Sequence, residues 1–203
     1  MVSIGGLESA AGGHDLLVEA VARLAPARPR LRLAIAGSGP MRTVLEIRAS
    51  ELGIRGRTTM LGWRTDVPDL LQAADVVVHP SRTEARGTAV IEAMLAGAAP
   101  VVATRIGWVP ELLGSEEGEP PVGHLVPAGD AASLAEAVER ALDARGGEAE
   151  RTMLAAARSR AEARHTTDCM VDGILATYRR ALADREDRGD REDAEDRTAG
   201  AVG

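Results

Sequence analysis

Short apolar, β-branched runs alternate along the chain with longer amphipathic segments. The apolar runs are VSIGG (2–6), LRLAIAG (31–37), TTMLG (58–62), VVVHPS (76–81), PVVAT (100–104) and GHLVP (123–127). The amphipathic segments predict helices at about 14–25, 40–53, 67–74, 88–97, 109–114, 131–144, 148–164 and 167–183. Strands that are apolar on both sides and separated by single helices are typical of a parallel sheet covered on both faces. We therefore predict an α/β fold: a doubly wound, Rossmann-like parallel sheet of about six strands with C-terminal helices.

The end of the chain has a different composition. Residues 184–197, DREDRGDREDAEDR, hold eight Asp or Glu, four Arg and almost no apolar side chain. Such a run cannot bury enough apolar surface to offset the entropy of folding. We expect residues 1–183 to form the Rossmann-like domain and residues 184–203 to form an acidic, disordered tail or a fraying helix end.

Composition excludes several function classes. The sequence contains no lysine, which excludes Schiff-base catalysis and the Gly-Lys pair of phosphate-binding loops. A net charge of -7 argues against a nucleic-acid partner. The single cysteine, Cys169, cannot form an internal disulfide, which is typical of a reducing compartment. Because no apolar run reaches the length of a transmembrane segment and no signal peptide opens the chain, we expect a cytoplasmic protein.

Loops that follow the strands are the places to seek a ligand, since open α/β sheets bind outside the carboxyl ends of their strands. The loop GSGP (37–40) lacks the third glycine of a dinucleotide fingerprint, because position 42 is Arg. HPSRTEARG (79–87) is a stronger candidate, since it leads into a helix opened by Gly87 and Thr88. Unpaired N–H groups and the positive dipole end of that helix predict a phosphate site.

That helix carries one isolated acid. From Thr88 to Ala96 the only charged residue is Glu92, about one turn in and on the same side as Thr88. We expect so apolar a helix to be buried, and a buried carboxylate needs hydrogen-bond donors. Vicinal sugar hydroxyls would supply two, and Glu84 on the preceding loop would bond a second sugar. A phosphate flanked by two such carboxylates fits a nucleotide sugar.

Other interpretations of these residues remain open. Glu92 could pair with an internal Arg while Glu84 is a solvated loop acid. The two glutamates could instead be the acid and nucleophile of a glycosidase, although the helix N-terminus beside them favours phosphate. For His14 we expect a capping or surface role, with contact to a phosphate as the alternative. For His79 we expect a structural role, with a catalytic one as the alternative. The four histidines are scattered without ligand spacing, so we predict no metal site and no cofactor.

Three stretches in order resemble one enzyme family. HPSRTEARGTAVIEAMLAGAAPVVAT (79–104) resembles the Glu-x7-Glu segment of retaining glycosyltransferases of family 4, which have the GT-B fold. Residues 31–63 resemble that family's preceding strand–helix–strand stretch, and GHLVPAGD (123–130) its Gly-x-Leu-Val-x-x-Gly-Asp segment. The resemblance covers roughly residues 1–183 and matches only the C-terminal, donor-binding half of a GT-B enzyme.

The resemblance implies roles for particular residues. Glu84 would be the catalytic-site residue that bonds the donor sugar, and Glu92 would bind the ribose. Gly87 and Thr88 would offer backbone N–H groups to the sugar and the diphosphate. The remaining donor-binding candidates are Gly62, Trp63 and Arg64 near the base, mainly through the main chain, and Arg86.

The resemblance also implies a reaction: transfer of a sugar, usually a hexose, from a nucleotide-diphosphate sugar with retention and without a metal. One departure from the family concerns the Arg and Lys that hold its diphosphate. The matching stretches here read Gly5-Gly6-Leu7 and Ala11-Gly12-Gly13, so both cations are missing. Arg82 and Arg86 are candidates to replace them.

We therefore expect a glycosyltransferase donor domain whose acceptor is held by an N-terminal half-domain or a partner chain. The alternative is a catalytically degenerate module that binds a nucleotide or a partner.

Overall fold

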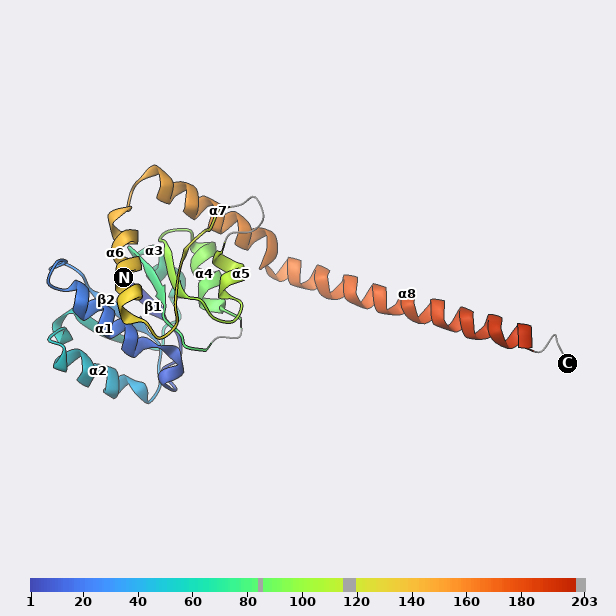
Figure 1. The fold of residues 1–203 in the computed structure, drawn as a ribbon, viewed down its shortest axis with the longest axis horizontal. Helices are drawn as coiled ribbons and strands as arrows, with labels where there is room; N and C mark the ends of the chain where they lie inside the picture. The colour runs from blue at the N-terminus through green and yellow to red at the C-terminus, as the bar shows by residue number, and fades with distance from the viewer. Residues whose placement is uncertain (84–85, 115–119, 200–203) are drawn as a thin grey trace. The chain divides into compact units, whose positions relative to one another are not determined.

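The computed structural model describes residues 1–83, 86–114 and 120–199 (Figure 1). Within them, six strands form one parallel sheet in the order β3-β2-β1-β4-β5-β6. The strands are β1 (Val2–Ile4), β2 (Leu33–Ala36), β3 (Thr58–Gly62), β4 (Val77–His79), β5 (Val101–Thr104) and β6 (His124–Val126). The strand order reverses between β1 and β4, which is where such sheets bind ligands. The predicted Rossmann-like fold is confirmed.

The helices agree closely with the sequence pattern. They are α1 (His14–Leu24), α2 (Met41–Glu51), α3 (Val67–Gln72), α4 (Thr88–Ala96), α5 (Val109–Leu113), α6 (Ala131–Asp143), α7 (Glu148–Arg164) and α8 (Thr167–Ala199), with short 3-10 helices η1 (Ala10–Gly12) and η2 (Arg55–Arg57). The ends of α1 to α7 lie within two residues of the predicted ranges. Asp130 caps α6, where its carboxylate accepts from the N–H groups of Ala132 at 2.9 Å and Ser133 at 3.0 Å.

The last helix extends further than predicted. The backbone of residues 184–199 continues α8, where the sequence analysis expects a disordered tail or a fraying helix end. Arg, Glu and Ala are good helix formers, so this run can continue a helix without a core of its own. The backbone therefore differs from the expected disordered tail, while the domain boundary at residue 183 stays a prediction. Within the described residues, no helix is both long and apolar enough to span a membrane.

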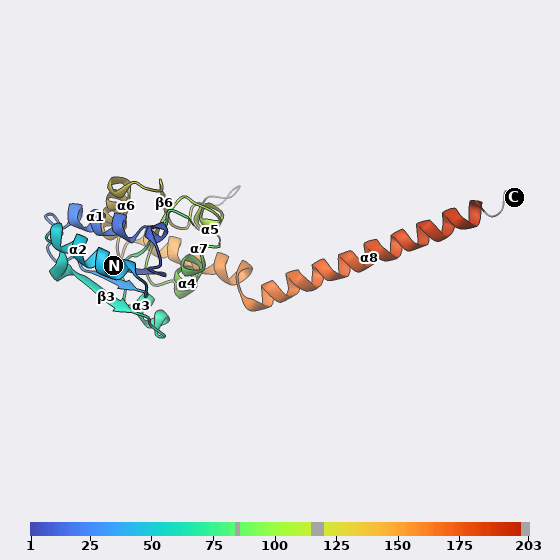
Figure 2. The same ribbon diagram turned by 90° about the horizontal axis from the view of Figure 1, so that it is seen from below.

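Two apolar layers enclose the sheet. Leu17 of α1 and Leu134 of α6 belong to the core on one face, and Met94 of α4 to the core on the other. Consecutive strand residues alternate between them, so that Val78 faces the first core and Val77 the second. Figure 2 shows α1 and α6 on one side of the sheet and α3 and α4 on the other. With both faces covered, only the strand ends are left to form a site.

At those strand ends, backbone segments touch directly. Gly13 has a left-handed φ of 67°, and a Cβ there would lie 1.8 Å from the carbonyl oxygen of Pro80. A Cβ on Gly37 would lie equally close, at 1.8 Å, to the carbonyl oxygen of Gly5. Glycine at these positions lets the loops after β1 and β2 lie against neighbouring backbone, and this contact shapes the edge of the sheet.

This contact predicts a large effect of Gly13→Ala, with Gly53→Ala as the matched control. Gly53 has a similar φ of 70°, but nothing lies within 4 Å of its Cβ position. The control should therefore lose only the strain of a left-handed alanine, about 1 kcal/mol of unfolding free energy. Gly13→Ala should lose several times more, because the Pro80 carbonyl must move. Urea unfolding of both variants tests this, and equal losses would contradict the close contact.

Candidate functional site

Two adjoining cavities lie at the carboxyl ends of the strands. The first, here called the wide cavity, measures about 330 Å³ and the second, the histidine cavity, about 170 Å³. Both are lined by Ile4, Gly5 and Gly6 at the end of β1. The other residues of the wide cavity are Glu8, Ala36, Gly37, Ser38, Trp63, Arg64, Val67 and Glu92. The other residues of the histidine cavity are Gly12, His14, His79, Pro80, Ser81, Thr88 and Ala89.

Helix α4 contributes to both cavities. Thr88 lines the histidine cavity and Glu92, one turn later, lines the wide cavity. Both residues are exposed, whereas Val90 and Met94 on the other face of α4 are buried. The expected burial of Glu92 is therefore wrong: the residue is exposed and lines the wide cavity. Its expected position beside the helix N-terminus is what the structure has.

The N-terminus of α4 is open to a ligand. Its N-cap is Gly87, with a left-handed φ of 67° and no side chain to accept from the first turn. The Gly87 carbonyl accepts from the N–H groups of Val90 and Ile91, at 2.9 and 3.0 Å. The first turn contains no acidic residue. Its leading N–H groups therefore point out with the positive end of the helix dipole, which suits an anion.

The end of β3 forms the far wall of the wide cavity. Gly62 ends the strand, and its carbonyl accepts from the N–H of Gly37 at 2.8 Å. Trp63 follows with 78% of its side chain exposed at the cavity wall. Arg64 donates from Nε to the Asp66 carboxylate at 2.7 Å, and this hydrogen bond holds the pKa of Asp66 below its usual value. The structure thus brings Trp63, Arg64 and Glu92 around one cavity, whereas Gly62, next to Trp63, is not part of its lining.

Glu84 and Arg86 are two further residues of the predicted site. Glu84 lies outside the described residues, so its position is not part of this description. Arg86 is exposed beside the N-terminus of α4 and belongs to neither cavity lining. Among the described residues, no group of three or more His, Cys, Asp or Glu lies together as metal ligands would.

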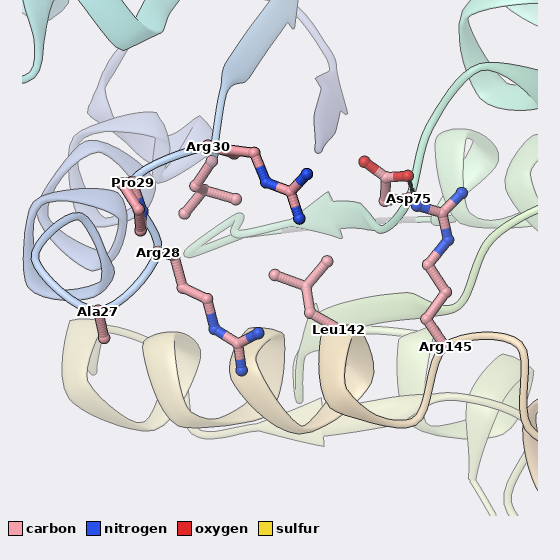
Figure 3. Close-up of a pocket in the computed structure, with 8 residues that line it drawn as sticks. Ala27, Arg28, Pro29, Arg30, Asp75, Leu142 and Arg145 are labelled. Atoms are coloured by element: carbon pink, nitrogen blue, oxygen red, sulfur yellow. Dashed lines mark ion pairs between the residues drawn. The ribbon is translucent and has the colours of Figure 1, made fainter.

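A third cavity, of about 620 Å³, lies at the opposite edge of the sheet (Figure 3). It is lined by Arg28, Arg30 and Leu142, together with Asp75 and Arg145, which form an ion pair. These residues sit at the amino ends of the strands, whereas open α/β sheets bind ligands at the carboxyl ends. The wide and histidine cavities are therefore the candidate site.

Known proteins with this sequence pattern identify the family. Residues 1–160 match the family described as Glycosyl transferases group 1. The chain belongs to this family. It is 33% identical over 177 residues to the lipopolysaccharide core biosynthesis mannosyltransferase LpsB of Rhizobium meliloti, covering 82% of this chain and 47% of LpsB. It is 35% identical over 191 residues to the D-inositol 3-phosphate glycosyltransferase of Mycobacterium tuberculosis, covering 86% of this chain and 37% of that enzyme.

Solved structures agree with this membership. HepE of Anabaena, in complex with UDP, matches with a TM-score of 0.76 and 26% identity, over 87% of this chain and 48% of HepE. Each of these relatives is a longer protein, and the chain spans about half of their length or less. The GT-B type of fold and the prediction of a glycosyltransferase are thereby confirmed, while family 4, retention and the match to the C-terminal half alone stay predictions.

The loops that lack the two diphosphate-binding cations of the family are held together by hydrogen bonds of Arg82. Arg82 donates to both oxygens of Asp15, at 2.6 and 2.7 Å, and to the carbonyl of Ala10 at 2.7 Å. Burial alone would raise the pKa of Asp15, but the hydrogen bonds and charge of Arg82 outweigh it and hold that pKa below its usual value. Arg82 therefore ties two loops together, and the hypothesis that it replaces a diphosphate-binding cation is not supported.

His14 differs most from expectation. A capping or surface role is expected from the sequence, yet the residue is buried, with only 5% of its surface exposed. Its Nε2 has no hydrogen-bond partner among the described residues. Burial, and then the charge of nearby His79, lower the pKa of His14 to about 4, with Asp15 offsetting part of the shift. The one sequence signal for this site is the glycine-rich stretch Gly5–Gly13, which leaves room beside the ring.

The low pKa of His14 predicts a pH dependence of stability. Between about pH 6.5 and pH 4 the unfolded chain binds a proton at this residue that the folded protein does not, so the unfolding free energy falls as pH is lowered through this window. A pKa shift from 6.5 to about 4 corresponds to a loss of about 3 kcal/mol at the acid end. Asp15, with its lowered pKa, loses its own contribution only at more acid pH.

Urea unfolding of the wild type and of His14→Gln at several pH values isolates this effect. The pKa values of His124 and His165 are also lowered by burial, but they act equally in both proteins. The wild type should lose more stability than the variant between pH 6.5 and pH 4. Parallel curves would show that His14 titrates normally.

Proposed function

We propose that this chain is the donor-binding half of a glycosyltransferase that takes a sugar from a nucleotide-diphosphate sugar and transfers it with retention at the anomeric carbon. One observation carries the proposal: the carboxylate of Glu92 stands one turn behind the open N-terminus of α4, where two cavities meet. A diol acceptor and an anion site at this separation suit a ribose and its attached phosphates.

The wide cavity would hold the nucleoside. Glu92 would accept hydrogen bonds from the two ribose hydroxyls, which are charge-assisted and therefore strong. The base would lie toward Gly62, Trp63 and Arg64, at the end of β3. Main-chain groups there would read the base, while the exposed indole ring of Trp63 offers an aromatic face against which a base can stack. HepE, which is similar to this chain, is known in complex with UDP and with UDP-glucose, and this supports the assignment.

The diphosphate would lie across the N-terminus of α4. The N–H groups that follow Gly87 would donate to phosphate oxygens, and Thr88 lines the same cavity. When the bond between the anomeric carbon and the phosphate oxygen breaks, negative charge grows on the departing diphosphate, and donors already in place stabilise it. Glu84, on the loop before α4, would bond the sugar. We propose that this chemistry needs no metal ion and no cofactor.

The acceptor would be bound elsewhere. The relatives that match are about twice as long as this chain or longer, so an acceptor-binding half-domain or partner chain would complete the site. We also propose a cytoplasmic location, which the lone cysteine of the sequence supports.

A second candidate function is a degenerate module that binds a nucleotide or a partner without catalysis. Gly6 and Ala11 stand where family members resembling this chain have cations, and Arg82 is engaged by Asp15. Mixing the chain with an acceptor-binding half of a relative and a radiolabelled sugar donor distinguishes the two functions. Sugar transfer supports the enzyme, whereas donor binding without transfer supports the module.

The role proposed for Glu92 predicts the effect of Glu92→Gln on nucleotide affinity. The variant loses charge-assisted hydrogen bonds to the ribose, so UDP should bind at least about tenfold more weakly by calorimetry. Glu111→Gln is the matched control, because Glu111 is an exposed glutamate on α5 that lines neither cavity. Equal affinities of the wild type and Glu92→Gln would contradict the proposed ribose site, and failure of the wild type to bind UDP, GDP or dTDP would contradict the proposed function.

A further inference from the structure

The histidine cavity contains a buried polar group that the fold does not use. The His14 Nε2 atom is out of contact with water and lacks a hydrogen-bond partner within the described part of the chain. A buried polar atom of this kind is costly, and native proteins almost always satisfy it. Gly13, which precedes His14 in the chain, lies directly against the Pro80 carbonyl, so the backbone next to the ring is closely packed. A ligand atom that accepts a hydrogen bond from Nε2 would remove this cost.

Glycines leave the ring edge uncovered. A Cβ on Gly5 would lie 3.6 Å from Cε1 and 3.8 Å from Nε2 of His14, and a Cβ on Gly12 would lie 2.9 Å from Nδ1. Side chains at these positions would cover the ring, and Gly6 beside them adds none. The 170 Å³ of the cavity thus lie between the imidazole and the first residue of α4, Thr88. An imidazole and a helix N-terminus that share one small cavity both present hydrogen-bond donors.

The ring is uncharged in the free protein at neutral pH, because burial and His79 lower its pKa to about 4. The titratable and charged groups around it are His79 on β4, Asp15 on α1 and Arg82, which pairs with Asp15. A neutral imidazole carries one N–H, and with the hydrogen on Nε2 it is a donor without a charge. Such a donor adds to the helix N-terminus without the repulsion that a second buried charge would bring.

We propose that His14 binds the donor's diphosphate, donating from Nε2 to a phosphoryl oxygen held at the N-terminus of α4. This rests on the proposed function, and adds a phosphate-binding residue where Gly6 and Ala11 provide no cation. Phosphate is the group selected, since it offers several strong acceptor oxygens to donors that converge from two sides. A sugar hydroxyl has a single oxygen and gains less from the helix dipole.

The test compares UDP with uridine by calorimetry. His14→Phe removes the donor and keeps an aromatic ring, so UDP should bind at least roughly tenfold more weakly while uridine binds unchanged. His14→Gln keeps an N–H donor and should retain much of the UDP affinity. Glu92→Gln should weaken both ligands, because both contain the ribose. UDP affinity that is equal in wild type and His14→Phe would overturn the inference and leave the proposed function standing.

Other results are equally decisive. If the wild type binds none of UDP, GDP and dTDP, the proposed function fails and this inference with it; if it binds GDP or dTDP instead of UDP, that nucleotide and its nucleoside replace UDP and uridine in the test. If His14→Phe weakens uridine as much as UDP, the ring supports the cavity in general and the phosphate role is overturned. Should the variant fail to fold, as judged by circular dichroism, the wild type answers the question by ¹⁵N imidazole NMR. UDP, and not uridine, should then shift Nε2 of His14 and raise its pKa; a resonance that responds to neither ligand would overturn the proposal.

Discussion

The structure depends on one contact between loops: the segment after β1 lies directly on the backbone that follows β4. Gly13 makes the contact possible, since any side chain there would meet the Pro80 carbonyl. The N–H of Arg82 then donates to the carbonyl of Ala11 at 2.7 Å, and its guanidinium holds Asp15. Because β1 and β4 are the strands between which the order reverses, this contact lies where such sheets bind ligands. His14 at the start of α1 and Thr88 at the start of α4 line the histidine cavity together with Pro80 from this contact.

The fold was predictable because its signals are local. Apolar runs such as LRLAIAG and VVVHPS predict strands buried on both faces, and the structure has β2 and β4 there. Position at the sheet edge was also predictable, since it follows from element order, and Glu92 and Trp63 both line the wide cavity there. The predictions that were wrong concern burial and pairing, which depend on residues distant in sequence. Glu92 is exposed although α4 is apolar, because helix composition does not tell which side a cavity occupies.

The same dependence on residues distant in sequence explains why the pairing of Arg82 and the burial of His14 were not predicted. Arg82 pairs with Asp15, 67 residues away, and no local pattern indicates that partner. His14 lies beside Gly5, Gly12 and His79, which come from the loop after β1, from η1 and from β4. The acidic C-terminal run shows the converse case, in which composition that suggests disorder is also rich in helix formers. Pairing and burial are properties of the assembled sheet, and a sequence pattern contains them only indirectly.

Electrostatics at the site rest on fixed dipoles more than on mobile charges. Arg64 and Arg82, two guanidinium groups near the cavities, each bind an aspartate, so their charges are largely matched within the chain. The amide groups of α4 and a neutral imidazole remain for an anion. Such groups are already oriented before the ligand arrives, and their effect grows as water is excluded. A site of this kind gains most of its strength only when it is closed.

The need to exclude water matters here because residues of both cavities are exposed. Glu92 and Thr88 are exposed and Trp63 is 78% exposed, so water reaches both ends of the proposed donor. Water weakens each hydrogen bond to the diphosphate, and it competes with any acceptor for the activated sugar. A second protein surface over the two cavities would remove that water and bring the acceptor to the anomeric carbon. The proposed nucleotide site is formed by residues of this chain, whereas the proposed transfer gains from a cover for which the relatives, with about twice the length, have room.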